Sequence, residues 1–398
     1  LNDWNVSNVT NMQNMFYNCR EFNQDINDWN VSNVTNMQEM FYYSLKFNQD
    51  INDWNVSNVT NMQNMFYNCL QFNKPLNDWN VSNVTNMQTM FRNCNEFNQS
   101  LNDWNVSNVT NMTGMFGNCY EFNQDISEWN VSNVTKMDEM FVNCRKFNEN
   151  ISEWNVSNVT TMNYMFHNCY EFNESLNWDV GKVTHMQSMF DGCMAFNQSL
   201  NWDVSNVTNM SYMFNNCYEF NGNISEWNVS NVRNMERMFN EAGQFNQNIS
   251  EWNVSNVTNM SYMFSGAIQF NQDLSQWNIS NNVNIEGMFN SNNNLSNINK
   301  NKLMIKYGSS NLTWSYYWYE FVDPIEELLP SFDSLSHSTT VSIISVLQYR
   351  NLFKTITNDM LSIICKIIVL YNNSTISDEN IYTIKIQRNI SNWHIAGN

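Results

Sequence analysis

The stretch WNVSNVTNM occupies Trp4–Met12 and returns, with small edits, at eleven further tryptophans as far as Trp277. Successive tryptophans are 25 residues apart, and twice only 24. A fixed period of this length predicts a solenoid, in which each copy forms one coil that stacks on the next. The twelve tryptophans are Trp4, Trp29, Trp54, Trp79, Trp104, Trp129, Trp154, Trp178, Trp202, Trp227, Trp252 and Trp277.

The composition shows that local propensity alone does not hold this fold together. The 398 residues include 81 asparagines, and asparagine favours neither helices nor strands. Yet 42% of the residues are hydrophobic and 15% are aromatic, which is too apolar for a disordered polar chain. The apolar residues must therefore be buried by a regular stacking of the repeats.

The spacing of the apolar residues predicts the structure of one coil. In the first copy they are Trp4, Val6, Val9, Met12, Met15, Phe16, Cys19, Phe22 and Ile26. Trp4 and Val6 alternate as in a short strand, whereas Met12, Met15, Phe16 and Cys19 follow the three-and-four spacing of a helix. We expect each coil to contain a short strand, a bend, a short helix and a return.

Polar residues that recur in every coil are expected to form hydrogen-bonded ladders. Asn23 and its equivalents, from Asn48 to Asn271, follow a core phenylalanine in eleven of the twelve copies. An Asn side chain there can satisfy turn N–H and C=O groups and can repeat its bonds along the stack. The column of Thr10, Thr35 and Thr60 allows an alternative, a flat strip that binds glycan or ice.

The cysteines and histidines do not form the set that a metal centre requires. Eight cysteines share one column: Cys19, Cys69, Cys94, Cys119, Cys144, Cys169, Cys193 and Cys217. Ser44, Ala242 and Ala267 replace them in other coils, so the column requires a small side chain and not a disulfide. Cys365 and the four histidines are scattered. With no nucleophile or phosphate-loop motif either, we expect a protein that is not an enzyme and has no cofactor and no metal.

All of the net charge lies on the repeats. Residues 1–299 contain 29 acidic and 10 basic residues, and the remainder is neutral. Nucleic acid is therefore not an expected partner. One acidic column precedes the tryptophans: Asp3, Asp28, Asp53, Asp78, Asp103, Glu128, Glu153, Glu226 and Glu251. These carboxylates are expected to face water, and a calcium-binding ladder is the alternative. Glu121, Lys146 and Glu171 are expected to lie side by side as a ladder of alternating charge.

Recognition is expected at the positions that vary between coils. Three of them, Asn14, Tyr17 and Arg20 in the first copy, point away from the core of the expected helix. Tyr and Arg are enriched in binding hot spots, although neutral drift on a solvated face also produces variability. The candidate partner-binding residues are Tyr17, Tyr42, Tyr67, Arg92, Tyr120, Arg145, Tyr170 and Tyr218.

The repeat resembles a known family. The run VTNMQNMFYNCREFNQDINDWNVSN, with its motifs VTNM, MF..C, FNQ and W.V, looks like the 25-residue repeat of the BspA-like, DUF285 class of leucine-rich-repeat surface proteins. The resemblance covers residues 1–298 and implies a leucine-rich-repeat-like solenoid of about twelve coils that binds a protein, or a glycan, on a cell or host surface. It implies a surface or secreted location and no catalytic residue.

The pattern stops near residue 299, and a different segment follows. Residues 299–398 are expected to form a small, mostly helical C-terminal cap or accessory domain of mixed α/β type, with helices at 341–347 and 361–370 and a strand at IYTIKIQ. No apolar run is long enough to cross a membrane. Because the sequence starts inside a repeat, we expect that the N-terminus is missing. An intracellular scaffold, whose C-terminal domain engages a cellular partner, is the competing interpretation.

Overall fold

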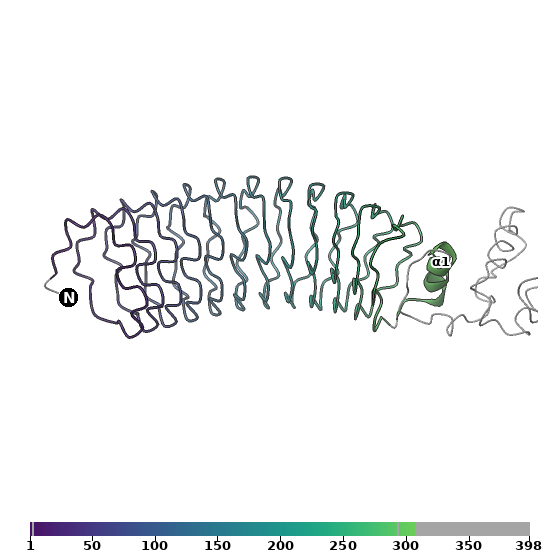
Figure 1. The fold of residues 1–398 in the computed structure, drawn as a ribbon, viewed down its shortest axis with the longest axis horizontal. Helices are drawn as coiled ribbons and strands as arrows, with labels where there is room; N and C mark the ends of the chain where they lie inside the picture. The colour runs from purple at the N-terminus through teal and green to yellow at the C-terminus, as the bar shows by residue number, and fades with distance from the viewer. Residues whose placement is uncertain (2–3, 293, 308–398) are drawn as a thin grey trace, which may run out of the picture. The chain divides into compact units, whose positions relative to one another are not determined.

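The computed structural model describes residue 1 and residues 4–292 and 294–307 of the chain. Contacts divide the chain into two units, Leu1–Leu295 and Ser296–Asn398. In the first unit the chain winds through successive coils that stand side by side along one axis (Figure 1). The predicted solenoid is therefore confirmed for this unit.

The tryptophans lie in single file along the stack. The rings of Trp104 and Trp129 are 6.4 Å apart between centroids and inclined by 4°, and those of Trp129 and Trp154 are 6.4 Å apart and inclined by 1°. Phenylalanines form parallel files, with Phe16 and Phe41 5.5 Å apart. Each aromatic side chain thus contacts its own counterpart in the next coil, which is the packing that the repeated sequence predicts.

The nine apolar positions predicted from the first copy form the core. In the second coil, from Trp29 to Ile51, all nine equivalents are buried. The first coil differs because it has a neighbour on one side only: Trp4 is 55% exposed, whereas Trp29 is 5% exposed. Burial of the core therefore depends on stacking, since one coil alone leaves its indole in water.

The strand and helix that we expected within each coil are wrong. The residues around Trp4 and Val6 form no strand, and parallel pairing is limited to single bridges one position before the conserved Met, from Asn11↔Asn36 to Asn259↔Asn284. The segment expected to be helical is a run of turns. Within the described residues the only helix is α1 (Asn297–Tyr307), which belongs to the second unit.

Backbone dihedrals explain why turns replace the helix. Asn14 and Asn18 have φ of 63° and 56°, and the equivalents of both have positive φ in every coil. Met15 N–H donates to Met12 O at 3.2 Å, so Asn14 is the third residue of its turn, where type II turns require positive φ. A right-handed helix cannot include such residues. A helix and this run of turns both place apolar side chains at intervals of three and four residues, and for that reason the spacing predicted a helix.

The hydrogen bonds that a helix would make within itself instead run between coils. Phe16 N–H donates to Met40 O at 2.8 Å, and Asn14 N–H donates to Gln38 O at 3.1 Å. Each coil therefore uses the next as its hydrogen-bond partner, as strands of a sheet do.

Side chains add further bonds between coils. Trp54 Nε1–H donates to Ile26 O at 3.1 Å, and the Cys69 thiol donates to Phe41 O at 3.1 Å. Ser44, which replaces cysteine, makes the equivalent bond to Phe16 O at 2.9 Å. The cysteine column therefore needs a small side chain, and in most coils that side chain also supplies a hydrogen-bond donor.

The expected ladder of asparagine side chains is present. Asn48 N–H donates to Asn23 Oδ1 at 2.9 Å, and the equivalent bond repeats in the following coils up to Asn271. Each of these asparagine side chains therefore binds the backbone of the next coil.

Several expectations concern residues outside those the structure describes. The helices expected at 341–347 and 361–370 and the strand at IYTIKIQ all lie there, so the C-terminal cap stays a prediction. Within the described ranges, no helix has the length and hydropathy that a membrane span needs.

Candidate binding surface

The variable positions lie together on the run of turns. We call the equivalents of Asn14, Tyr17 and Arg20 in all coils the turn ridge. The Met15 and Phe16 equivalents point into the core, whereas most side chains at these three positions reach the surface. The buried exceptions include Val142, Ser188 and Asp191. An outward set of variable residues was predicted, although on a helix and not on turns.

The first three coils carry a stack of tyrosines on this ridge. Tyr17 and Tyr42 stack with centroids 4.8 Å apart and 5° between planes, and Tyr67 continues the stack at 4.8 Å. Tyr43 tilts against Tyr42 at 4.9 Å. Burial, followed by the neighbouring tyrosines, raises the pKa of Tyr42 above its ordinary value. Tyr17 is 48% exposed, which leaves one end of the stack open.

Arg92 belongs to the same column but does not extend the stack. Its guanidinium pairs with Glu139, two coils further on, at 2.6 Å. It reaches that far because Gly114 and Gly117 leave room: a Cβ on Gly114 would lie 2.8 Å from Arg92 Nη1. Arg92 is thus half-buried and already paired, which makes it the weakest of the predicted binding residues.

The column of Arg20 equivalents contains three predicted binding residues that the structure brings together. The Arg145 guanidinium carbon lies 4.5 Å from the Tyr120 ring centroid and 5.8 Å from that of Tyr170, so the arginine is held between two rings. Such distances are typical of cation–π contacts. Tyr218 makes no comparable contact among the described residues and is 44% exposed.

A second arginine between two rings lies in the first column, where the sequence analysis named only Asn14. Arg237 lies 5.8 Å from the Tyr212 ring and 4.8 Å from the Tyr262 ring. The signal was available, because this column reads Tyr, Arg, Tyr in three consecutive coils at the spacing used for the other columns.

Two carboxylates of the acidic column accept hydrogen bonds from asparagine side chains. Asn27 Nδ2 donates to Asp53 Oδ2 at 3.1 Å, and Asn52 Nδ2 donates to Asp78 Oδ2 at 2.7 Å, so amides from the preceding coil bind these carboxylates. Over the described part of the chain, no three His, Cys, Asp or Glu side chains are grouped so as to hold a metal ion.

Opposite charges do alternate on another column, where Lys146 Nζ lies 2.8 Å from Glu171 Oε1. Glu171, followed by the more distant Glu121, raises the pKa of Lys146. This agrees with the expected ladder of alternating charge.

The threonine column uses its hydroxyls within the stack. Thr35 Oγ1–H donates to Thr10 O at 3.2 Å, and Thr60 repeats the bond to Thr35. The side chains are exposed but their donors are already used. A glycan would therefore find acceptors and methyl groups on this strip and few free donors.

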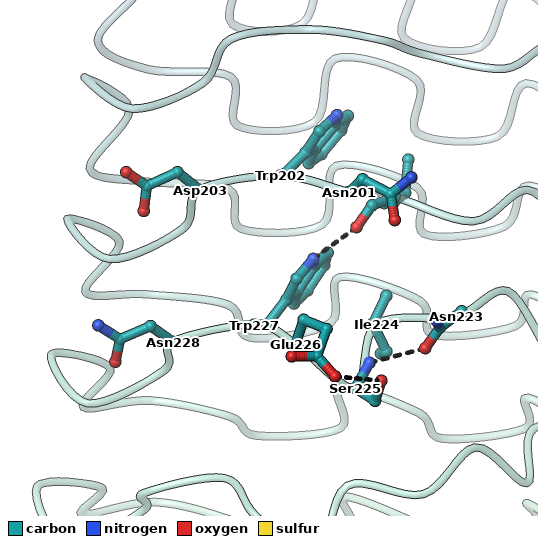
Figure 2. Close-up of a pocket in the computed structure, with 10 residues that line it drawn as sticks. Asn201, Trp202, Asp203, Asn223, Ile224, Ser225, Glu226, Trp227 and Asn228 are labelled. Atoms are coloured by element: carbon teal, nitrogen blue, oxygen red, sulfur yellow. Dashed lines mark hydrogen bonds between the residues drawn. The ribbon is translucent and has the colours of Figure 1, made fainter.

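A hollow of about 430 Å³ lies where a 24-residue coil meets a 25-residue coil. Figure 2 shows Trp202 and Trp227 one above the other beside it, with Asp203 pointing away. Its polar groups are used locally: Trp227 Nε1–H donates to Leu200 O at 2.7 Å, and Ser225 N–H donates to Asn223 Oδ1 at 3.0 Å. The polar groups that line the hollow thus do not form a set of free groups that converge on a ligand.

Comparison with known proteins finds several leucine-rich repeat proteins at low similarity. None of the curated proteins compared with the chain matches it. A leucine-rich cell surface protein from Faecalibacterium prausnitzii is similar at 14% identity and TM-score 0.31, over 69% of this chain and 81% of that one.

Two further solved structures are similar at the same low level. A leucine-rich repeat protein from Eubacterium ventriosum has 12% identity and TM-score 0.31, over 63% of this chain and 70% of that one. The TLR13–ssRNA13 complex has 10% identity and TM-score 0.25, over 67% of this chain and only 45% of that one. TM-scores this low carry no argument about partners.

Sequence similarity places the chain in a family. The model of the family described as "Mycoplasma protein of unknown function, DUF285" matches residues 1–104, 85–201 and 200–302. The three matches are consecutive, overlap slightly and together cover the stacked coils. The chain therefore belongs to the DUF285 family, whose repeat forms this solenoid.

Proposed function

We propose that this protein is a non-catalytic binding scaffold and that the turn ridge contacts a protein partner. The observation that carries the proposal is the pair of tyrosine–arginine clusters and the tyrosine stack, all displayed on the variable side of an invariant frame. Tyrosine and arginine give large contact areas with polar edges, as binding hot spots do.

Backbone strain favours selection over neutral drift as the source of the variability. The columns of Asn14 and Asn18 both have positive φ in every coil. Asn or Gly occupies nine of the twelve positions in the Asn18 column, but only four of the twelve in the Asn14 column. The first column has Tyr164, Tyr212 and Tyr262 instead, although a bulky residue with positive φ is strained. Drift would favour the unstrained residues, so these side chains support a function at the surface.

A location on a cell surface, with a role in adhesion, is the finer form of this proposal. It follows the resemblance to surface repeat proteins and the acidic charge, which keeps a long solenoid soluble. The alternative is an intracellular scaffold whose C-terminal residues bind a second partner. Imaging of the tagged full-length protein on intact and permeabilised cells separates the two locations.

The test compares two triple variants of the full chain. Tyr17, Tyr42 and Tyr67 are changed to Ala in the first, and Thr60, Thr85 and Thr110 to Ser in the second, which keeps the threonine hydroxyls. We expect the tyrosine variant to lose a partner that the wild type and the threonine variant both capture, with loss of affinity for the purified partner. Equal affinity of all three proteins would contradict a role for the tyrosine stack.

A further inference from the structure

We infer that Arg237, held between Tyr212 and Tyr262, forms a subsite for a carboxylate of a polypeptide partner. This inference rests on the proposed binding role of the turn ridge and gives one point on it a defined chemistry. The two rings fix the guanidinium, with its carbon 5.8 Å and 4.8 Å from their centroids.

The guanidinium has donors that nothing in the described structure uses. Arg237 forms no side-chain hydrogen bond and no ion pair there; its Nε is buried without a partner, and the residue as a whole is partly exposed. Arg92, by contrast, is paired with Glu139. An unpaired guanidinium with both faces covered by rings is prepared for bidentate contact with an oxyanion, because its planar fork matches a carboxylate.

Two carboxylates that contact the tyrosines of this cluster accept hydrogen bonds from other groups. Glu236 accepts the Tyr212 hydroxyl on Oε1 at 3.0 Å and Asn259 Nδ2 on Oε2 at 3.1 Å. Glu286 accepts the Tyr262 hydroxyl at 3.2 Å. The two tyrosines thus stack on the arginine and also donate hydrogen bonds to these two acids, neither of which pairs with Arg237 in the described structure.

The backbone at this site is strained. Tyr212, Arg237 and Tyr262 have φ of 60°, 52° and 56°, at positions where Asn64 and Gly114 show that unstrained residues fit. Gly287 follows in the next coil, and a Cβ there would lie 2.5 Å from a Tyr262 ring atom, so the glycine makes room for the ring. Three strained residues and one accommodating glycine in succession indicate that this cluster is maintained for its side chains.

Charge selects the kind of anion. The repeats carry a strongly negative net charge, so a dianionic phosphate is repelled more than a single carboxylate on an otherwise neutral or basic partner. Arg145, between Tyr120 and Tyr170, repeats the geometry in a residue that is more exposed than Arg237, and we regard it as a weaker copy of the same subsite.

The test uses small probes and needs no partner. Arginine Nε–H NMR signals of the full chain are followed at constant ionic strength while N-acetylglycinate, methyl phosphate or chloride is added. We expect a saturable shift of the Arg237 signal with N-acetylglycinate, a weaker one with methyl phosphate, and none at Arg92. A shift at Arg237 that is linear, matches that at Arg92 or is equalled by chloride would overturn the inference.

Two substitutions separate binding from folding. Arg237→Asn is expected to abolish acetylglycinate binding, followed in this variant through the ring signals of Tyr212 and Tyr262, while raising the melting temperature by about 1–3 °C, because Asn tolerates positive φ. Tyr262→Asn should keep the fold and weaken acetylglycinate binding by about three- to tenfold. An unchanged affinity for acetylglycinate in Arg237→Asn would overturn the inference.

The source of the carboxylate is tested by competition. A glutamate-containing tetrapeptide amide should bind at Arg237 at least as tightly as an oligogalacturonide; tighter binding of the uronate would overturn the polypeptide partner in favour of a glycan. Loss of partner capture in the tyrosine triple variant tests the proposed function separately, since that variant leaves Arg237 intact.

Discussion

At the scale of single residues, the cysteine column shows how burial controls reactivity. Cys69 and the six cysteines stacked after it, up to Cys217, are buried, whereas Cys19 in the first coil is exposed. Burial raises the pKa of the Cys94 thiol well above its ordinary value, and the adjacent thiols raise it further. The same cause acts on Cys144 and Cys169. The thiolate that reacts with electrophiles is therefore suppressed along the stack.

We predict that Cys19 alone reacts rapidly in the native repeats. In a Cys365→Ser variant, which removes the thiol outside the described residues, a disulfide-exchange reagent at pH 8 should label one thiol quickly and seven only after denaturation. Peptide mapping identifies the labelled residue, and Cys19→Ser removes the fast phase. Rapid labelling of Cys119 or Cys144 would show that the stack opens.

The same burial predicts a loss of stability at alkaline pH. A buried thiol has a higher pKa in the folded than in the unfolded chain, so its contribution is complete below the unfolded pKa and is lost as the pH rises above about 8.5. Between pH 8 and pH 10.5 the urea midpoint of the wild type should fall further than that of a variant with Cys94, Cys119 and Cys144 changed to Ser. The serines keep the donor, as Ser44 does. Parallel curves for the two proteins would contradict the prediction.

At the scale of the turn, the asparagine column at the Asn18 position has two roles. Asn118 has φ of 62°, and its side chain links Asn93 to Asn143 in a continuous ladder. Asparagine tolerates positive φ better than other residues with a Cβ, which explains why it recurs in this column.

Substitutions at Asn118 should separate these roles. Asn118→Gly removes only the ladder bonds and should cost about 1 kcal/mol. Asn118→Ala also introduces strain and should cost about 1–2 kcal/mol more. Glu241→Asn, at an equivalent position with φ of 59°, should instead stabilise the protein. Urea denaturation measures all three, and equal effects of Gly and Ala would show that φ is not the determinant.

The sequence allows the stack and its core to be predicted but not the conformation within a coil. The period places Trp29 beside Trp54 whatever the local structure, and it fixes which positions are buried. The spacing of Met12, Met15, Phe16 and Cys19, by contrast, suits a helix and a run of turns equally. The signal that separates them is the alternation of Asn with Gly at the Asn18 position, which indicates positive φ.

The candidate site was predicted in part for the same reason. Equivalence between coils brings Tyr120, Arg145 and Tyr170 together, as expected. The direction of a long side chain depends on its neighbours, however, and Arg92 turns away because two glycines leave a path to Glu139. The residues of the Arg92 column alone do not predict that direction, because it depends on the glycines in neighbouring coils.

At the scale of the whole solenoid, coils are equivalent units joined by similar interfaces. Each interface contains the same backbone bonds, such as Phe41 N–H to Met65 O at 2.9 Å and Phe66 N–H to Met90 O at 2.9 Å. The free energy of unfolding is then close to a sum over coils and interfaces. Removal of one whole coil should therefore subtract one such contribution, whereas a change of register should disrupt the interfaces themselves.

Register can be tested by deletion. Removal of residues 60–84 takes out one complete coil and joins Val59 to Thr85, so every column continues with equivalent residues. We expect this protein to fold cooperatively with a smaller urea m-value, since less surface is exposed on unfolding. Removal of residues 60–71 deletes half as much chain but places the columns out of register, and it should destabilise the array far more, as circular dichroism and the urea midpoint would show. If the shorter deletion were the milder of the two, the coils would not be the units of this fold.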